Sequence, residues 1–262
     1  MEYADEPRLI FSPLTEQDYC KFYNLEMSCY VDDLSFYTAL LHDKDHVLEL
    51  GCGTGRLTRH LAKSCEHITG IDRSGEMLKI ADIKAPKNVS YQLMDMLQLS
   101  FRSPFDTIVI PYNTINLLGN RAKVEKCLKL CCRYLTPTGK LAFHAYHPSI
   151  AIKRTNESEK QFQFAIFDDQ NGGRVVKETL KWFHKSSSTL NLEERYRVRP
   201  VSGCNEFRDL RHNLQLYTPD LSAWKLLLRK SGFSIKNTQG DANGKSFCAD
   251  NDTSIFIHAE KV

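Results

Sequence analysis

The chain has 262 residues, of which 42% are hydrophobic and 26% are charged, and its formal net charge is +3. A chain of this size can bury one large core or two smaller ones. The small net charge, without a long run of lysine and arginine, makes nucleic acid an unexpected partner. The N-terminal stretch lacks the basic start and apolar centre of a signal peptide, and no apolar run is long enough to cross a bilayer. We therefore expect a cytoplasmic protein with no membrane partner.

The nine cysteines lie at irregular intervals between Cys20 and Cys248. An odd number without paired C-x-x-C spacing is typical of reduced thiols that serve as small buried residues, so we expect neither a disulfide framework nor a metal site.

Short apolar runs alternate with helical patterns through the first half of the chain. A helix is expected around Leu34, Tyr37 and Leu41, with Asp32 or Asp33 as its cap. The strand candidates that follow are residues 46–50, 67–71, 89–93, 106–110 and 140–146. Because strands and helices alternate, the pattern predicts a parallel sheet covered on both faces, which binds ligands at the carboxyl ends of its strands.

The pattern changes after residue 148. Alternating runs and turn residues predict an antiparallel β insertion at residues 149–217, a substrate cap, with Phe162, Phe164 and Trp182 in its own core. Arg195, Arg197 and Arg199 recur with period two and so share one strand face. That face is interpreted as solvated, and the alternative is a binding edge for an acidic substrate group or a nucleotide phosphate.

The α/β pattern then resumes at residues 218–262. Thr218 as cap, Pro219 at the first position and Gly232 past the end predict a helix, followed by two last strands. The predicted fold is a doubly wound, Rossmann-like, seven-stranded sheet with an antiparallel insertion after the fifth strand. Residues 1–148 would hold the N-terminal helices and the ligand-binding core, 149–217 the insertion, and 218–262 the last helix and strands of the core.

The stretch "ELGCGTG", Glu49 to Gly55, runs from a strand into three alternating glycines. Glycines there let a ligand approach the backbone closely. The dinucleotide fingerprint G-x-G-x-x-G fails because Arg56 stands at the third glycine position, and the phosphate-binding G-x-x-x-x-G-K-[ST] loop is absent. The remaining pattern is E-x-G-x-G-x-G.

This pattern resembles the first motif of class I S-adenosylmethionine-dependent methyltransferases. The resemblance continues through "GIDRSGEML" and "LMDM" at the expected intervals, and it covers roughly residues 30 to 148 and the last two strands. It implies S-adenosyl-L-methionine as cofactor, a ligand with ribose hydroxyls and an amino-acid tail but no phosphate.

The resemblance also implies roles for individual residues. Asp72 would accept hydrogen bonds from the ribose hydroxyls, Asp95 would accept from the adenine amino group, and Glu49 would orient the glycine loop. The alternative for both aspartates is a helix or turn cap, and for Met77 a core filler. The residues expected at the cofactor are Glu49, Gly51, Cys52, Gly53, Gly55, Asp72, Arg73, Met77, Asp95, Met96 and Pro111.

The fourth strand ends in "IPYNTINLL". DNA-adenine and glutamine methyltransferases carry Asn/Asp-Pro-Pro-Tyr/Phe here, but Ile110 replaces the polar residue, which argues against a flipped base as substrate. The overall layout is similar to N-methyltransferases of nucleotide-linked amino sugars, and more loosely to the glycine/sarcosine group. Tyr23 matches an N-terminal tyrosine of the sugar enzymes, whereas Leu117 stands where their proposed catalytic histidine aligns.

The residues expected at the methyl acceptor are Tyr23, Tyr112, Asn113 and His147, with His144 as a further candidate. The two histidines would point to opposite faces of a strand, which disfavours a shared metal. The leading hypothesis is a methyltransferase that acts on a small molecule, at nitrogen. The alternatives are an RNA or protein methyltransferase on the same core and a non-catalytic protein that binds S-adenosylmethionine. The oligomeric state is open.

Overall fold

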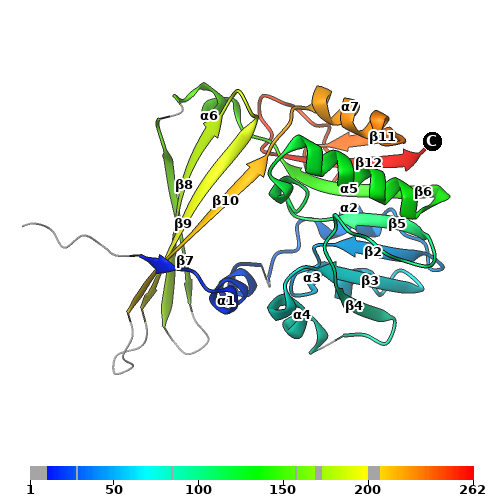
Figure 1. Ribbon diagram of the computed structural model, residues 1–262, viewed down its shortest axis with the longest axis horizontal. Helices are drawn as coiled ribbons and strands as arrows, with labels where there is room; N and C mark the ends of the chain where they lie inside the picture. The colour runs from blue at the N-terminus through cyan, green and yellow to red at the C-terminus, as the bar shows by residue number, and fades with distance from the viewer. Residues whose placement is uncertain (1–10, 28, 84, 157, 169–172, 200–206) are drawn as a thin grey trace, which may run out of the picture.

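The computed structural model describes residues 11–27, 29–83, 85–156, 158–168, 173–199 and 207–262. They form two sheets that lie side by side, with a helix between them (Figure 1). Among these residues no helix is both long and apolar enough to cross a membrane.

The larger sheet has seven strands in the order β11-β12-β6-β5-β2-β3-β4, and β12 alone runs antiparallel to its neighbours. The predicted Rossmann-like sheet is therefore confirmed. Parallel order puts the carboxyl ends of β2, β3 and β5 at one edge, and the glycine loop follows β2 at that edge. The strands are β2 (His46–Leu50), β3 (His67–Asp72), β4 (Val89–Leu93), β5 (Phe105–Ile110), β6 (Leu135–Tyr146), β11 (Phe233–Gln239) and β12 (Ser254–Lys261).

Helices cover both faces of this sheet. On one face α5 (Arg121–Tyr134) and α7 (Leu221–Lys230) pack Leu128, Trp224 and Leu227 against the strands. On the other face α2 (Leu34–Thr38) and α3 (Arg56–Leu61) contribute Phe36, Tyr37 and Leu57. The helix α4 (Gly75–Asp82) follows β3, and a short 3-10 helix, η1 (Asn116–Leu118), follows β5.

The second sheet contains the inserted strands, in the order β1-β10-β9-β8-β7. The strands β7 (Gln161–Asp168), β8 (Arg174–His184), β9 (Thr189–Arg199) and β10 (Arg208–Tyr217) form the antiparallel sheet expected from the turn pattern. A short α6 (Ile150–Arg154) precedes them. The short β1 (Ser12–Pro13), which the sequence did not predict, joins this sheet beside β10.

The helix α1 (Glu16–Met27) lies between the two sheets (Figure 1). Its Phe22 stacks on Tyr196 of β9 with the ring centroids 4.8 Å apart and packs among Val175, Val198 and Leu210. The face of the smaller sheet that contacts α1 is called the inner face below, and the opposite one the outer face. Because α1 touches the inner face and also reaches the glycine loop, it places the insertion beside the edge of the core.

Two local predictions were wrong. Phe162 and Phe164 are 59% and 64% exposed on the outer face rather than buried in a core of the insertion, because β7 is an edge strand and their period puts them away from α1. The cap of α7 is Asp220, whose carboxylate accepts the Ala223 N–H at 2.8 Å, whereas the Thr218 hydroxyl donates to the Ser188 carbonyl.

Candidate cofactor and active site

The glycine loop is held by backbone contacts to the neighbouring strand. The N–H groups of Gly51 and Cys52 both donate to the Ile71 carbonyl, at 2.8 and 2.9 Å. Gly51, Gly53 and Gly55 have φ values of +72°, +54° and +74°, a conformation that glycine adopts without strain. The loop is therefore fixed in shape before any ligand arrives.

Neighbouring side chains approach this loop closely. A Cβ at Gly51 would lie 2.3 Å from Cγ2 of Thr114, and one at Gly55 would lie 2.3 Å from the Tyr91 hydroxyl. At Gly53 a Cβ would lie 3.4 Å from the ring of Tyr23. Both backbone conformation and space therefore require glycine at the outer two positions.

Asp72, at the end of β3, supports the loop directly. One carboxylate oxygen accepts the Gly53 N–H at 2.9 Å, and the other accepts the Ser74 N–H at 2.9 Å. The Ser74 hydroxyl in turn accepts the Met77 N–H, which caps α4. Asp72 thus joins the ends of β2 and β3, and each oxygen keeps a further lone pair for a ligand hydroxyl.

The other residues expected at the adenosine lie around the same edge. Met77 is buried on α4, and Arg73 is exposed. Asp95 is exposed after β4, and its carboxylate accepts the Leu97 N–H at 2.8 Å; the next residue, Met96, is half-buried. The structure therefore shows a turn contact for Asp95, and a role for it toward adenine stays a prediction.

Glu49 lies under the loop with 1% of its surface exposed. Its carboxyl accepts a hydrogen bond from the Thr58 hydroxyl at 2.6 Å. Burial raises the pKa of Glu49 to about 8, because a buried carboxylate loses its hydration. At neutral pH this carboxyl is largely protonated.

Arg56 begins α3 and lines the same pocket. Its guanidinium donates to both carboxylate oxygens of Asp33, at 2.7 Å each, and to the Tyr30 carbonyl at 3.1 Å. Sequence reasoning missed this pair because the two residues are 23 positions apart and Asp33 read as a helix cap. Arg56 therefore connects residues 30–33 to the start of α3 next to the glycine loop. Its guanidinium is already paired with Asp33.

The turn after β5 is strained. Tyr112 and Asn113 have φ values of +44° and +62°, although neither is glycine. The Asn113 N–H donates to the His144 carbonyl at 3.1 Å, while its buried side-chain oxygen has no hydrogen-bond partner among the described residues. Strained backbone and unsatisfied buried oxygen atoms are concentrated at ligand sites. The turn brings Tyr112 and Thr114 to face the glycine loop.

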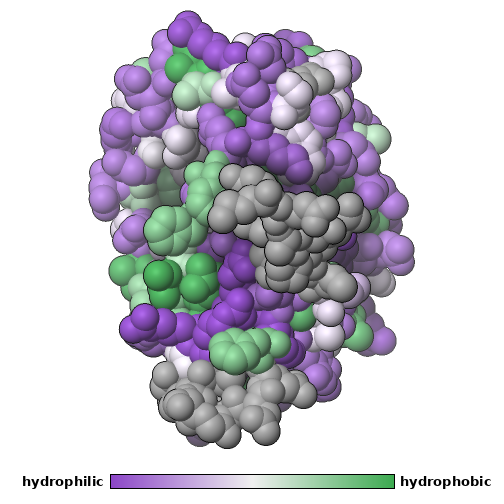
Figure 2. Space-filling model, turned by 90° about the vertical axis from the view of Figure 1, so that its left-hand side faces the viewer, coloured by the Kyte–Doolittle hydropathy of each residue, from purple (hydrophilic) through white to green (hydrophobic). Residues whose placement is uncertain are grey.

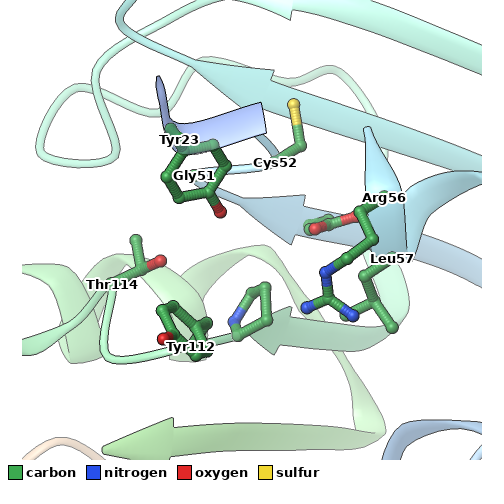
Figure 3. A pocket seen from close by; sticks show the side chains of 9 residues that line it. Tyr23, Gly51, Cys52, Arg56, Leu57, Tyr112 and Thr114 are labelled. Carbon is green, nitrogen blue, oxygen red and sulfur yellow. The ribbon is translucent and has the colours of Figure 1, made fainter. Parts of the chain in front are cut away.

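Tyr23 closes the pocket from the opposite side. Figure 3 shows its hydroxyl pointing into the space between Tyr112 and Arg56. The pocket is small and is lined by Tyr23, Glu49, Gly51, Cys52, Arg56, Leu57, Pro111, Tyr112 and Thr114. Seven of the residues predicted from the sequence are therefore brought together here, namely Tyr23, Glu49, Gly51, Cys52, Gly53 beside Tyr23, Pro111 and Tyr112.

The two histidines of β6 and its end lie outside this lining. His147 contacts the Ala249 carbonyl at 3.1 Å, Lys153 at 3.1 Å and the ring of Phe247. His144 is buried against Phe256, with ring centroids 4.3 Å apart, and its centroid lies 6.0 Å from that of Tyr112. Burial lowers the pKa of His144 to about 4, so the ring is neutral.

A buried charged cluster connects the pocket to the insertion. Lys177 of β8 lies 2.7 Å from Glu26 of α1 and 2.8 Å from Glu194 of β9. The Tyr196 hydroxyl donates to the second Glu194 oxygen at 3.0 Å. Lys177 and Glu194 are only 13% and 7% exposed at their side chains. The sequence carried no sign of this cluster, because its members come from three elements.

On the outer face the three arginines share one side of β9, as predicted, and each has an acidic partner. Arg195 pairs with Glu193 at 2.7 Å, Arg197 with Glu178 at 3.0 Å, and Arg199 with Asp209 at 2.9 Å. This face points away from α1 and the pocket. An acidic substrate group bound by these arginines would therefore lie far from the glycine loop.

Comparisons with known proteins agree with this geometry. Residues 47–139 match a family described as a methyltransferase domain. A Bacillus subtilis protein named as a methyltransferase, YqeM, is 34% identical over 136 residues, 51% of this chain and 52% of that protein. An O-methyltransferase of ubiquinone biosynthesis from Coxiella burnetii is 33% identical over 102 residues, 37% of this chain and 42% of that one. The match thus spans about half the length of these relatives.

A solved structure shares the whole architecture. The sugar N-methyltransferase KedS8 from Streptoalloteichus superposes with a TM-score of 0.72 at 15% identity, covering 98% of each chain. At that identity the likeness shows the fold, insertion included. Residues 47–139 thus match a methyltransferase domain, and the described chain has the fold of solved S-adenosylmethionine-dependent methyltransferases.

Proposed function

We propose that this chain transfers the methyl group of S-adenosylmethionine to the nitrogen of a small-molecule acceptor. The observation that carries the proposal is the strained turn at Tyr112 and Asn113, which faces the glycine loop and is covered from the other side by Tyr23. Three elements converge there on one small space. Such convergence holds two reactants in line, which is the main requirement for a direct displacement.

The residues around the loop fit this cofactor. Gly51 and Gly55 leave bare backbone where a Cβ would collide with Thr114 or Tyr91. Asp72 would offer acceptors to the ribose hydroxyls, and Asn113 has a buried oxygen without a partner among the described residues. When bound, the cofactor supplies an electrophilic methyl group on a sulfonium. The chain's own part is to hold the acceptor in line and keep water out.

The protonation state of the side chains that line the pocket favours nitrogen as the atom that accepts the methyl group. Burial raises the pKa values of Tyr23 and Tyr112 and brings that of Glu49 to about 8. These three groups hold their protons at neutral pH and are poor bases. An amine that binds in its neutral form needs no base to attack, whereas a hydroxyl or an ammonium does. The name of KedS8, a sugar N-methyltransferase, supports the same class of acceptor.

A small acceptor is supported by the way the insertion closes the site. Tyr19 and Tyr23 share one side of α1, with ring centroids 6.2 Å apart, and Tyr19 lies 5.1 Å from His212 of β10. These rings stand between the pocket and the inner face of the sheet. Aromatic rings of α1 therefore lie on the side of the pocket toward the insertion, which favours a small acceptor over a macromolecule.

The cofactor half of the proposal is tested by calorimetric titration with S-adenosylhomocysteine. We expect Asp72→Ala to weaken binding at least about tenfold, because it frees the Gly53 N–H and removes a hydroxyl acceptor. Asp106→Ala is the matched control, since Asp106 accepts the His46 N–H at 2.9 Å at the opposite end of the strands. Equal affinity of both variants, or no binding by the wild-type chain, would contradict the assignment.

The acceptor half is tested with methyl-labelled S-adenosylmethionine. The wild-type chain is incubated with three fractions of a cell extract: small molecules, RNA and protein. We expect label only in the small-molecule fraction, on an amine identified by mass spectrometry. Label in RNA or protein, or on an oxygen, would overturn this half while leaving cofactor binding intact. The Tyr23→Phe variant keeps the ring over the loop and should retain cofactor binding while it slows transfer.

A further inference from the structure

The edge strand β7 carries an exposed apolar stripe. Phe162, Phe164 and Ile166 are 59%, 64% and 54% exposed, and the two phenylalanine rings stack with centroids 6.3 Å apart. All three lie on the outer face, because the intervening Ala165 and Phe167 share the side of Val175, which packs against α1. Figure 2 shows apolar side chains gathered along one side of this face, next to a hydrophilic centre.

The strand also ends the sheet. Among the described residues β7 pairs with β8 alone, so its other side presents backbone N–H and C=O groups over eight residues. Natural edge strands are usually short, or are protected by charge or proline, because an open edge pairs with other chains. Here the edge is long and apolar, and its charges stand only at its ends. Such an edge can pair with a strand of another chain through its free backbone groups.

The sequence around the stripe favours the β7 strand of a second copy of the chain as that partner. Lys160 precedes the strand and Asp168 ends it, with Phe164 midway between them. In an antiparallel pairing about a two-fold axis at Phe164, this residue lies opposite the partner's Phe164, Phe162 lies opposite the partner's Ile166, and Lys160 lies opposite the partner's Asp168. Apolar residues meet apolar ones, and opposite charges meet at both ends.

Neighbouring registers lose this match. With the axis at Ala165, Phe162 would lie opposite the partner's Asp168. With the axis at Gln163, Lys160 would lie opposite the partner's Ile166. The charged ends differ in their present contacts. Asp168 is 86% exposed at its side chain with a 3.7 Å contact to Arg174, whereas Lys160 is 43% exposed, contacts Glu193 at 3.3 Å and lies 4.5 Å from the centroid of the Trp182 ring.

From this self-complementarity we infer that two copies of the chain pair through β7 to form a dimer with one continuous ten-stranded sheet. A two-fold contact uses the same patch on both copies, as isologous interfaces do. The two-fold axis of this pairing would run perpendicular to the sheet beside β7, so the outer faces of both copies would lie on the same side of the joined sheet. The inference does not depend on the proposed reaction.

Sedimentation velocity at micromolar concentrations tests the dimer. We expect the wild-type chain to be dimeric and Phe164→Lys to weaken the dimer at least about 100-fold, because two lysines would then face each other at the axis. Leu93→Lys is the matched control, since Leu93 is 67% exposed on β4, the edge of the other sheet. Circular dichroism checks that both variants are folded. A monomeric wild type, or equal effects of both variants, would overturn the inference.

Charge reversal and cross-linking test the register. Asp168→Lys and Lys160→Asp should each weaken the dimer, and the double variant should restore it. Under mild oxidation Phe164→Cys should form a linked dimer faster than Phe162→Cys, because only position 164 faces itself at a Cβ separation of about 5 Å. The wild type sets the baseline for the exposed thiols of Cys29 and Cys248. Equal linking rates, or a double variant as weak as the single ones, would reject this pairing.

Discussion

The two sheets of this protein differ in how many charged side chains they carry on their faces. In the seven-stranded sheet Leu48, Ile71 and Ile108 are fully buried, and the strands are apolar on both faces. In the five-stranded sheet ion pairs occur on both faces, with Lys177 and Glu194 inside and Arg197 and Glu178 outside. The central strands of the core sheet are specified mainly by apolar burial, whereas the smaller sheet depends on which charges meet.

The two faces of the smaller sheet also differ from each other. Inside, Lys177 is 13% exposed and bridges two carboxylates next to the pocket. Outside, Arg197 and Glu178 are 23% and 18% exposed and form a single pair. Burying charge is expensive and adds little net stability, whereas removing one partner of a buried pair leaves an uncompensated charge. Four substitutions probe the stability of these regions.

Removal of the inner lysine should destabilise the protein most. Lys177→Met leaves Glu26 and Glu194 close together without their cation, and we expect the free energy of unfolding to fall by about 3 kcal/mol. Arg197→Met on the outer face is the control, with an expected loss below about 1 kcal/mol. Urea denaturation measures both. Similar losses would show that the two faces carry equivalent ion pairs.

A methyl group added to the glycine loop should cost less stability. Gly51→Ala places a Cβ against Thr114 at a φ of +72°, so we expect a loss of about 2 kcal/mol together with weaker binding of S-adenosylhomocysteine. Gly75→Ala is the control, because nothing lies within 4 Å of its Cβ and it begins a helix. That variant should gain about 0.5 kcal/mol. Loss of affinity in both would mean that the loop is not the binding element.

The buried carboxyl in the core should make stability depend on pH. Glu49 has a pKa of about 8 in the folded chain against 4.5 ordinarily, so the folded state holds a proton that the unfolded state releases between these values. The contribution of Glu49 to the free energy of unfolding should therefore be fully present below about pH 4.5. It should fall as the pH rises toward 8, by at most about 1.4 kcal/mol per pH unit.

Comparison with Glu49→Gln isolates this dependence. The amide can still accept from the Thr58 hydroxyl but does not titrate, so its unfolding free energy should fall less between pH 5 and pH 8 than that of the wild type. Urea denaturation at several pH values gives the difference, in which the contribution of His144 cancels. Parallel curves would indicate an ionised Glu49 in the folded chain.

The smallest effect is expected at the start of α7. Asp220→Ala removes the carboxylate that accepts the Ala223 N–H, with an expected cost of about 1 kcal/mol. Thr218→Val keeps the shape of Thr218 and tests the cap predicted from the sequence. If the valine variant lost more stability than the alanine variant, the Ser188 contact of Thr218 would matter more than the cap.

The core was predictable because its signals are local. Runs such as residues 46–50 are apolar throughout, as strands buried on both faces must be, and the glycines of the loop need their φ values whatever surrounds them. Tyr23, Glu49 and Tyr112 could be placed at the pocket because the resemblance fixes their positions along the chain. The Asp33–Arg56 pair could not, because nothing in the sequence links a helix cap to an arginine 23 residues later.

In the insertion the period of the strands was readable, but the side that would be buried was not. Phe162 and Phe164 were expected inside, yet α1 covers the opposite face and leaves them exposed. The sequence by itself determined the positions of most strands along the chain, the glycine loop and the acids that follow it, because these follow from hydrophobic period and backbone conformation. Only the tertiary structure decided which face of the insertion meets the pocket, since that depends on where α1 packs and on charges brought together from three distant segments.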